Sequence, residues 1–334
     1  MEAAKERLRG VAHETPLKRS YTLDDMFGTP IFLKLENLQR TGSYKIRGAF
    51  NKIALLPEHA RRRGVIAASA GNHAQGVAYA ARAYGVPCTI VMPETAPRTK
   101  IQATSSYGAR VILHGRTYDE AYAHARRLTE VEGFTYVHAF DDPDVIAGQG
   151  TVGLEILQVE PALDLIVVPV GGGGLISGVA TAARTMAPNA RVIGVQAAGA
   201  ASFVRSLAAG RRIVQDDIYT LADGIAVKQP GALTFEMVTR LDVEMVTVEE
   251  EEIVAAIMLL LEREKLLVEG AGAAALAAVL AGRVPVAGRR TAVIVSGGNI
   301  DLKRLSTLVA EPSAPPADPS TPAPGDPVHK TSVR

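Results

Sequence analysis

Cysteine is almost absent from this sequence, since Cys88 is the only one in 334 residues. One cysteine cannot form an intramolecular disulfide, and Cys88 lies in an apolar run where a buried structural thiol is expected. The composition therefore indicates a reducing compartment. An excess of one charge is also absent, because 36 Lys and Arg residues face 35 Asp and Glu residues. This balance indicates neither nucleic acid nor a membrane surface as a partner, and it fits small zwitterionic molecules better.

Long hydrophobic runs are missing as well. No apolar stretch approaches the roughly 18 residues that a membrane span needs. Residues 1–10 are charged and lack the apolar core of a signal peptide, so we expect a cytoplasmic protein without membrane contacts. At about 100–200 residues per domain, the chain is long enough for two domains with a catalytic cleft between them.

Short β-branched runs alternate with longer helix-like segments, a pattern typical of parallel sheets with crossover helices. The expected strands are Val65–Ala68, Thr89–Met92, Arg110–Leu113, Leu165–Val170, Arg191–Gln196 and Thr291–Ser296. They fall into two series, so we expect two α/β units: a small domain at 55–142, and a large domain built from 1–54 and 143–310. Residues 311–334 hold seven of the 19 prolines and no aromatic residue, which predicts a Pro-rich disordered tail.

Four glutamates, Glu249–Glu252, begin another expected helix, Glu249–Lys265. Thr247 and Glu250 have the spacing of a capping box, and the helix dipole favours anions at this end. We therefore interpret the acidic run as structural and not as a metal site.

A glycine run at 171–174 follows the expected strand Leu165–Val170 and opens a helix. Successive backbone amides at a helix N-terminus suit a phosphate dianion, although a tight turn for close helix packing is the alternative. A dinucleotide fits poorly, because Ser177 stands at the third glycine position and the next strand ends at Gln196 instead of a carboxylate. No Gly-Lys-Ser/Thr closes the loop as an ATP site requires. The phosphate is therefore expected to belong to a different cofactor.

Three further stretches combine turn-forming residues with reactive or hydrogen-bonding side chains. Lys45 lies in Thr41–Gly48, which is too rich in small residues for an ordinary amphipathic helix. Ser69–His73 joins an expected strand to a helix and offers backbone amides to an anion such as a carboxylate. Ser296–Asn299 ends the last expected strand with a hydroxyl donor.

Together the four stretches resemble the tryptophan-synthase-β type of pyridoxal-phosphate enzyme (fold type II), and most closely its threonine dehydratase and serine racemase group. The resemblance covers about residues 5–310. It implies an α/β fold with two parallel-sheet domains and pyridoxal 5′-phosphate in the cleft between them.

The resemblance also implies roles for individual residues. Lys45 carries the cofactor as a Schiff base and is the catalytic base, Asn72 meets the phenolic oxygen of the cofactor, and Ser296 meets its pyridine nitrogen. The residues expected at the phosphate are Gly171, Gly172, Gly173, Gly174 and Leu175. Tyr44 either packs on the cofactor ring or belongs to the core, and Gly224 is a further backbone contact. The residues expected at the substrate carboxylate are Ser69, Ala70, Gly71, Asn72 and His73.

Two more stretches narrow the reaction. His138–Pro143 and Glu269–Ala273 resemble the catabolic threonine dehydratases, with Ala139 in place of a common proline. This implies conversion of L-threonine to 2-oxobutanoate and ammonia, with L-serine as a second substrate. The open alternatives are a serine racemase, a dehydratase for another β-hydroxy amino acid such as hydroxyaspartate, and a non-catalytic amino-acid-binding relative. In the resembling racemases a serine proton donor stands at the position of Ala70.

No metal is expected. Serine-racemising relatives often bind a divalent cation just after the strand that here ends at Gln196. The nearby residues are Gln196, Ala200 and Ser202, which offer no carboxylate. Similarity to the family further implies a homodimer or a homotetramer.

Overall fold

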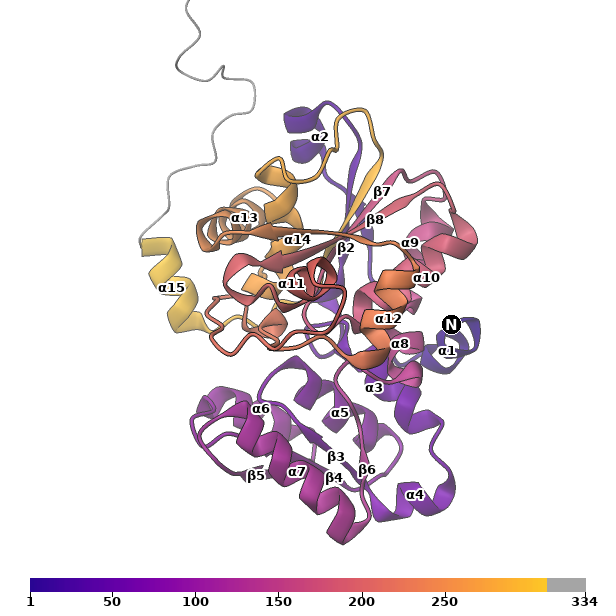
Figure 1. Ribbon diagram of the computed structural model, residues 1–334, viewed down its shortest axis with the longest axis vertical. Helices are drawn as coiled ribbons and strands as arrows, with labels where there is room; N and C mark the ends of the chain where they lie inside the picture. The colour runs from indigo at the N-terminus through magenta and orange to yellow at the C-terminus, as the bar shows by residue number, and fades with distance from the viewer. Residues whose placement is uncertain (311–334) are drawn as a thin grey trace, which may run out of the picture.

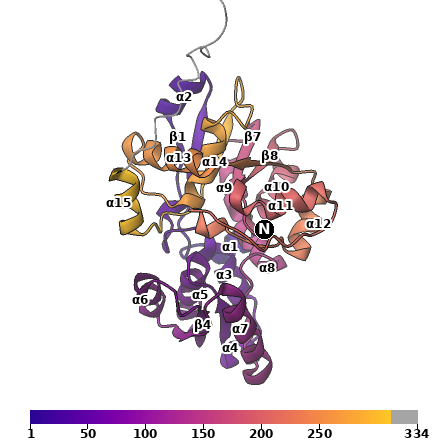
Figure 2. The same ribbon diagram turned by 60° about the vertical axis from the view of Figure 1, so that its left-hand side comes forward.

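The computed structural model describes residues 1–310, and in it two β-sheets with helices on both faces lie one above the other (Figure 1). The tail predicted at 311–334 lies outside the described residues. Figure 2 shows the same division, with α2 (Tyr21–Phe27) at one end of the molecule and α4 (Glu58–Arg63) near the other. No helix among residues 1–310 is long and apolar enough to cross a membrane.

The larger sheet has six strands in the order β1-β2-β10-β7-β8-β9, and only the β1–β2 pairing is antiparallel. The strands are β1 (Leu17–Arg19), β2 (Ile31–Leu35), β7 (Leu165–Pro169), β8 (Arg191–Ala197), β9 (Glu244–Val248) and β10 (Thr291–Val295). Val167 packs on the face covered by α13 (Glu250–Glu262) and α14 (Gly270–Leu280). Val168 packs on the other face, beneath α9 (Thr151–Val159) and α10 (Gly174–Met186). Burial on both faces explains why the central strands are continuous apolar runs.

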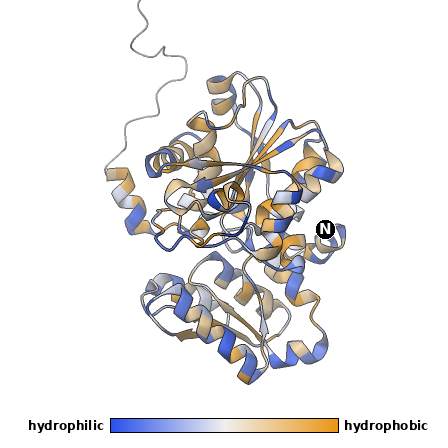
Figure 3. Ribbon diagram, viewed as in Figure 1, coloured by the Kyte–Doolittle hydropathy of each residue, from blue (hydrophilic) through white to orange (hydrophobic). Residues whose placement is uncertain are grey.

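The smaller sheet is parallel throughout, with the order β5-β4-β3-β6. Its strands are β3 (Val65–Ala68), β4 (Cys88–Met92), β5 (Arg110–Leu113) and β6 (Thr135–Tyr136). The core on one face includes residues of α3 (Lys45–Ala54) and α5 (Asn72–Ala83), and α7 (Tyr118–Glu132) covers the other face. Figure 3 shows apolar strands, with hydrophilic residues on the outer sides of the helices.

The other helices are short. They are α1 (Glu2–Leu8), α6 (Arg98–Ser106), α8 (Pro143–Gln149), α11 (Ser202–Ala208), α12 (Ala232–Arg240) and α15 (Leu302–Ala310), with the 3₁₀ turns η1 (Glu36–Leu38), η2 (Ala198–Ala200) and η3 (Asp223–Ile225). Of these, α8 packs against α3 and thereby joins the region around the larger sheet to the region around the smaller one.

The six predicted strands are confirmed to within one residue at either end, whereas β1, β2, β6 and β9 are not among them. The predicted capping box of Thr247 and Glu250 is wrong. Because β9 continues to Val248, the N-cap is Glu249, whose side chain accepts from the Glu252 backbone while its own N–H donates to the Glu252 carboxylate at 2.8 Å.

The domain boundaries at 54/55 and 142/143 remain a proposal. All strands of the smaller sheet come from 55–142, which supports the division. However, α3 ends at Ala54 and contributes Ala49, Phe50 and Ile53 to the core beside the smaller sheet. This helix therefore packs with the segment that follows it.

Candidate active site

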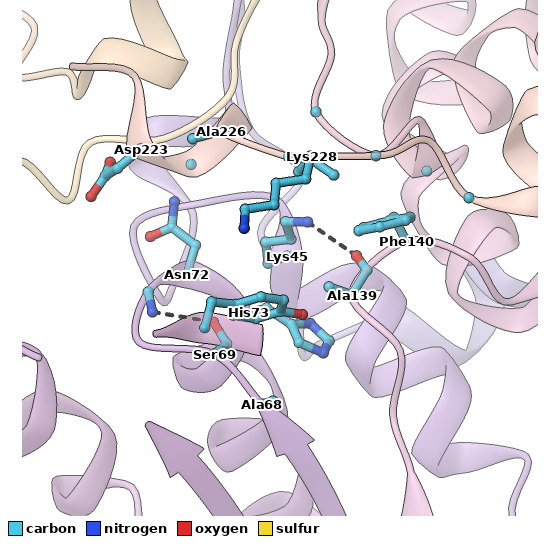
Figure 4. Close-up of a pocket in the computed structure, with 18 of the residues that line it drawn as sticks. Lys45, Ala68, Ser69, Asn72, His73, Ala139, Phe140, Asp223, Ala226 and Lys228 are labelled. Atoms are coloured by element: carbon cyan, nitrogen blue, oxygen red, sulfur yellow. Dashed lines mark hydrogen bonds between the residues drawn. The ribbon is translucent and has the colours of Figure 1, made fainter. Parts of the chain in front are cut away.

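A cavity of about 870 Å³ lies at the carboxyl ends of β3 and β7, where open α/β sheets commonly bind ligands. Figure 4 shows Lys45, Asn72 and His73 from the region of the smaller sheet across from Asp223 and Lys228. The predicted site residues that line the cavity are Tyr44, Lys45, Ser69, Ala70, Gly71, Asn72, His73, Gly171, Gly172, Gly173, Gly174, Leu175 and Gly224. The structure thus brings together four segments that are far apart in the sequence.

Lys45 is the first residue of α3 and is partly buried. Its Nζ donates a hydrogen bond to the Ala139 carbonyl at 3.0 Å (Figure 4). Burial lowers the pKa of the Lys45 amine to about 8, although the Glu269 carboxylate opposes this shift. About a tenth of the amine is therefore uncharged at pH 7, far more than for an ordinary lysine, and the uncharged form is the one that a nucleophile or base requires.

A buried ion cluster, formed by Lys34, Glu36, Arg47 and Glu155, lies beneath the start of α3. The Arg47 guanidinium donates to Glu36 at 2.8 and 2.9 Å and to Glu155 at 2.5 and 2.8 Å. Lys34 Nζ donates to Glu155 at 2.6 Å. Two cations balance two carboxylates, so the charges are paired even though they are almost fully buried. The cluster fixes α3 to β2 and α9, two residues after Lys45.

The glycine run forms a cradle of bare backbone at the start of α10. Gly173 has φ +99°, a conformation that side chains disfavour. A Cβ added at Gly172 would lie 2.4 Å from the Phe140 ring, and one added at Gly173 would lie 2.6 Å from Phe203. No side chain therefore fits, and the backbone amides at the N-terminus of this 13-residue helix stay open to the cavity. Such amides suit a phosphate.

The stretch at 69–73 starts α5 from Gly71, its N-cap. The Ser69 hydroxyl accepts a hydrogen bond from the Gly71 N–H at 3.2 Å. His73 Nε2 donates to the Val137 carbonyl at 2.8 Å, and Nδ1 is buried with no partner among residues 1–310. Burial, and then the nearby Lys45, lower the pKa of His73 to about 3. The imidazole is thus uncharged at physiological pH and supplies no positive charge to the site.

Ser296 is the one predicted site residue that is not among those lining the cavity. Its hydroxyl donates to the Ala271 carbonyl at 3.1 Å, and its own carbonyl accepts from the Tyr44 N–H at 3.3 Å. The Ser296 backbone therefore lies next to a lining residue, Tyr44, and the role of its side chain toward a pyridine nitrogen remains a prediction.

The sequence analysis did not predict several charged residues that line the cavity. Glu269 lines the cavity within a stretch that was recognised only by resemblance. Two ion pairs also span the rim, Lys100 with Asp223 at 2.7 Å and Lys228 with Asp119 at 2.7 Å. Each pair joins a helix beside the smaller sheet to the segment around η3. Their partners are 123 and 109 residues apart in the chain, so no local pattern indicates them.

Gln196, near the carboxyl end of β8, binds backbone groups of the next helix. Gln196 Oε1 accepts hydrogen bonds from the N–H groups of Phe203 and Val204 at 2.9 and 3.0 Å. Over the described part of the chain, no group of three or more His, Cys, Asp or Glu side chains could hold a metal ion.

The arrangement fits a cofactor that carries both a phosphate and an aldehyde. The glycine cradle offers amide donors for the phosphate, and Lys45 offers an amine with a lowered pKa in the same cavity. The start of α5 adds a second set of backbone amides, suited to a carboxylate.

Comparisons with known proteins agree with this fit. The model of a family described as pyridoxal-phosphate dependent enzyme matches residues 8–297. An L-threonine ammonia-lyase of Thermotoga maritima is 53% identical over 309 residues, which are 92% of this chain and 77% of that protein. The catabolic L-threonine dehydratase TdcB of Escherichia coli K12 is 45% identical over 307 residues, which are 91% of this chain and 93% of that protein. The structure of maize serine racemase aligns with a TM-score of 0.88 and 36% identity, covering 92% of this chain and 95% of that one.

Proposed function

Because this chain belongs to the family of pyridoxal-phosphate-dependent enzymes, we propose that it converts L-threonine to 2-oxobutanoate and ammonia, with L-serine as a second substrate. The family match confirms the predicted cofactor and, with the structural likeness, the predicted fold class. The observation that carries the proposal is the cavity that combines Lys45, the glycine cradle and the start of α5. The 53% identity to an L-threonine ammonia-lyase supports the choice of substrate.

Each part of the cavity has a task in this reaction. Bound pyridoxal phosphate supplies an electron sink for negative charge at the α-carbon of an amino acid. Gly171 to Leu175 would hold its phosphate, Lys45 its aldehyde carbon, Asn72 its phenolic oxygen and Ser296 its pyridine nitrogen. Tyr44 and Gly224 would border its ring.

Side chains and backbone amides of the protein bind the substrate and move its proton. The N–H groups at the start of α5 bind the substrate carboxylate and orient the α-carbon. The uncharged Lys45 Nζ takes the α-proton, since it is the basic amine with a lowered pKa in this cavity. The β-hydroxyl leaves as water, and a water molecule then hydrolyses the released enamine to the 2-oxo acid and ammonia.

The pKa of Lys45 predicts how the apoprotein captures its cofactor. Only the uncharged amine forms the bond, so the initial capture rate should rise roughly tenfold from pH 6 to pH 7. It should level off above about pH 8, where the amine is already mostly uncharged. Borohydride trapping followed by mass spectrometry measures the rate and the site. A rate that still climbs tenfold per pH unit between pH 9 and 10 would contradict the lowered pKa.

Ala70 separates the dehydratase from the racemase alternative. Racemisation needs a proton donor on each face of the α-carbon, and the methyl group of Ala70 cannot donate one. With L-serine we expect pyruvate as the main product and D-serine as a minor one, and we expect Ala70→Ser to raise the D-serine share. Ala70→Gly, which adds no hydroxyl, is the matched control. Comparable early amounts of D-serine and pyruvate from the wild type would favour a racemase.

We also propose that the protein works in the cytoplasm as a homodimer or a homotetramer. The near absence of cysteine, which is typical of a reducing compartment, supports the location. Resemblance to the family supports the assembly. Light scattering after size-exclusion chromatography decides the assembly, and a monomeric mass at micromolar concentration would contradict it.

A further inference from the structure

Glu269 is a buried carboxylate at the cavity to which the reaction described above gives no task. Glu269 is 5% exposed and is the N-cap of α14. Its backbone N–H donates to the Gly297 carbonyl at 3.2 Å. Its Oε1 accepts a hydrogen bond from Asn72 Nδ2 at 2.5 Å. Burying a carboxylate costs free energy. Its strong hydrogen bond to Asn72, a residue of the cavity, therefore indicates a function there.

A chain of hydrogen bonds sets the orientation of the Asn72 amide. It begins at the Thr41 carbonyl, which can only accept, so the nearest Asn299 atom, at 2.8 Å, is Nδ2. Asn299 Nδ2 also donates to Asn72 at 2.8 Å, which makes that atom Oδ1. Asn72 Nδ2 then faces Glu269. One hydrogen of Nδ2 is used by Glu269, and the other is left to the cavity.

Two glycines leave room for this chain. A Cβ added at Gly42 would lie 2.4 Å from Asn299 Oδ1, and one added at Gly297 would lie 2.3 Å from Glu269 Oε1. The network therefore connects three of the predicted stretches, Thr41–Gly48, Ser69–His73 and Ser296–Asn299.

We propose that Glu269 is a positioning residue that holds the Asn72 amide with one N–H directed into the cavity, toward the phenolic oxygen of the cofactor. This inference rests on the proposed function only for the role of Asn72. Without the carboxylate, only the Asn299 hydrogen bond still holds the Asn72 amide, so its donor side is less firmly directed at the oxygen of the cofactor. Figure 4 shows the Asn72 side chain at the cavity, below Asp223.

The charged form of Glu269 is the stronger acceptor. Burial, and then Asp223 on η3, raise the pKa of Glu269 to about 7, whereas the Asn72 hydrogen bond, Lys100 on α6 and Lys45 on α3 oppose the rise. Tyr44, beside Lys45, is a further titratable group near Glu269, and it remains protonated because burial raises its pKa well above the usual value. The positioning effect should therefore be nearly full at pH 8, half lost at about pH 7 and small at pH 6.

A double-mutant cycle on cofactor affinity tests the proposal without a substrate. Apoproteins are titrated with pyridoxal phosphate at pH 8, and absorbance gives the dissociation constant. Glu269→Gln should weaken binding about 5- to 10-fold, as expected for the loss of a charge-assisted hydrogen bond. The same substitution in an Asn72→Ala background should change nothing further. At pH 6 the ratio between Glu269→Gln and wild type should approach one.

Glu264→Gln is the matched control. Glu264 is also a buried carboxylate, 7% exposed, but it pairs with Lys18 at 2.8 Å and does not line the cavity. Its substitution should leave the dissociation constant unchanged. If Glu269→Gln does not fold, Asn299→Ala removes the other end of the chain and should weaken binding only while Asn72 is present.

Equal losses of affinity in the wild-type and Asn72→Ala backgrounds would overturn the proposal, and so would no loss in either. Because these titrations contain no amino acid, their outcome is independent of the substrate. Failure to release 2-oxobutanoate from L-threonine would instead overturn the proposed function and leave the result on Glu269 standing.

Discussion

Replacing Lys45 with alanine should abolish 2-oxobutanoate release while the protein still folds. The residue is expected to hold the cofactor and to move the α-proton, so its loss removes two tasks at once. Losses of this kind reach at least about 10⁴-fold in turnover. The fold should lose less than about 1.5 kcal/mol, because the side chain makes one hydrogen bond, to Ala139, at the edge of an open cavity.

Lys52→Ala is the control for this experiment. Lys52 lies on the same helix, but it pairs with Asp142 and Asp144 at 2.7 and 3.0 Å and does not line the cavity. Turnover measured by 2-oxo acid release should survive this substitution, and urea unfolding compares the stability of both variants with the wild type. Near-normal turnover of Lys45→Ala would remove the central claim about the site.

The second large effect concerns stability. Arg47→Met removes one cation from the buried ion cluster and leaves Glu36 and Glu155 with only Lys34 to balance them. An uncompensated buried charge typically costs about 3–5 kcal/mol, which is a large part of the free energy of unfolding of a domain. Adding Glu36→Gln to Arg47→Met restores neutrality and should recover part of the loss. Urea unfolding measures all three proteins.

Arg62→Met tests whether charge alone explains the effect. Its partner is Glu58, one helical turn away, and both side chains are 77% exposed. An exposed pair of this kind contributes at most about 1 kcal/mol. If both arginine variants lose the same small amount, the cluster does not stabilise the start of α3 as argued here.

Local patterns in the sequence predicted the central strands and the loops that follow them. The reason is physical: a strand buried on both faces must be a continuous apolar run, and open backbone amides need glycine. β2 lacks this signature because Lys34 interrupts it, and that lysine is tolerated only because Glu155, 121 residues away, pairs with it. β1 is a three-residue edge strand, too short to show a period.

At the candidate site, too, the sequence revealed the local motifs but not the contacts between distant residues. Lys45, Asn72 and the glycine run belong to local motifs and could be identified. Glu269 could not be assigned a task, since its contact to Asn72 spans 197 residues. Its raised pKa likewise depends on burial and on Asp223, neither of which the neighbouring sequence reveals.

The two ion pairs at the cavity rim have opposite polarity. The helix α6 presents a cation, Lys100, to Asp223, whereas the helix α7 presents an anion, Asp119, to Lys228. If the two halves of the molecule slid past each other so that the partners were exchanged, Lys100 would face Lys228 and Asp119 would face Asp223. Like charges would then repel at both positions. The two ion pairs therefore favour one alignment of the two sheet regions and disfavour the alignment in which their partners are exchanged.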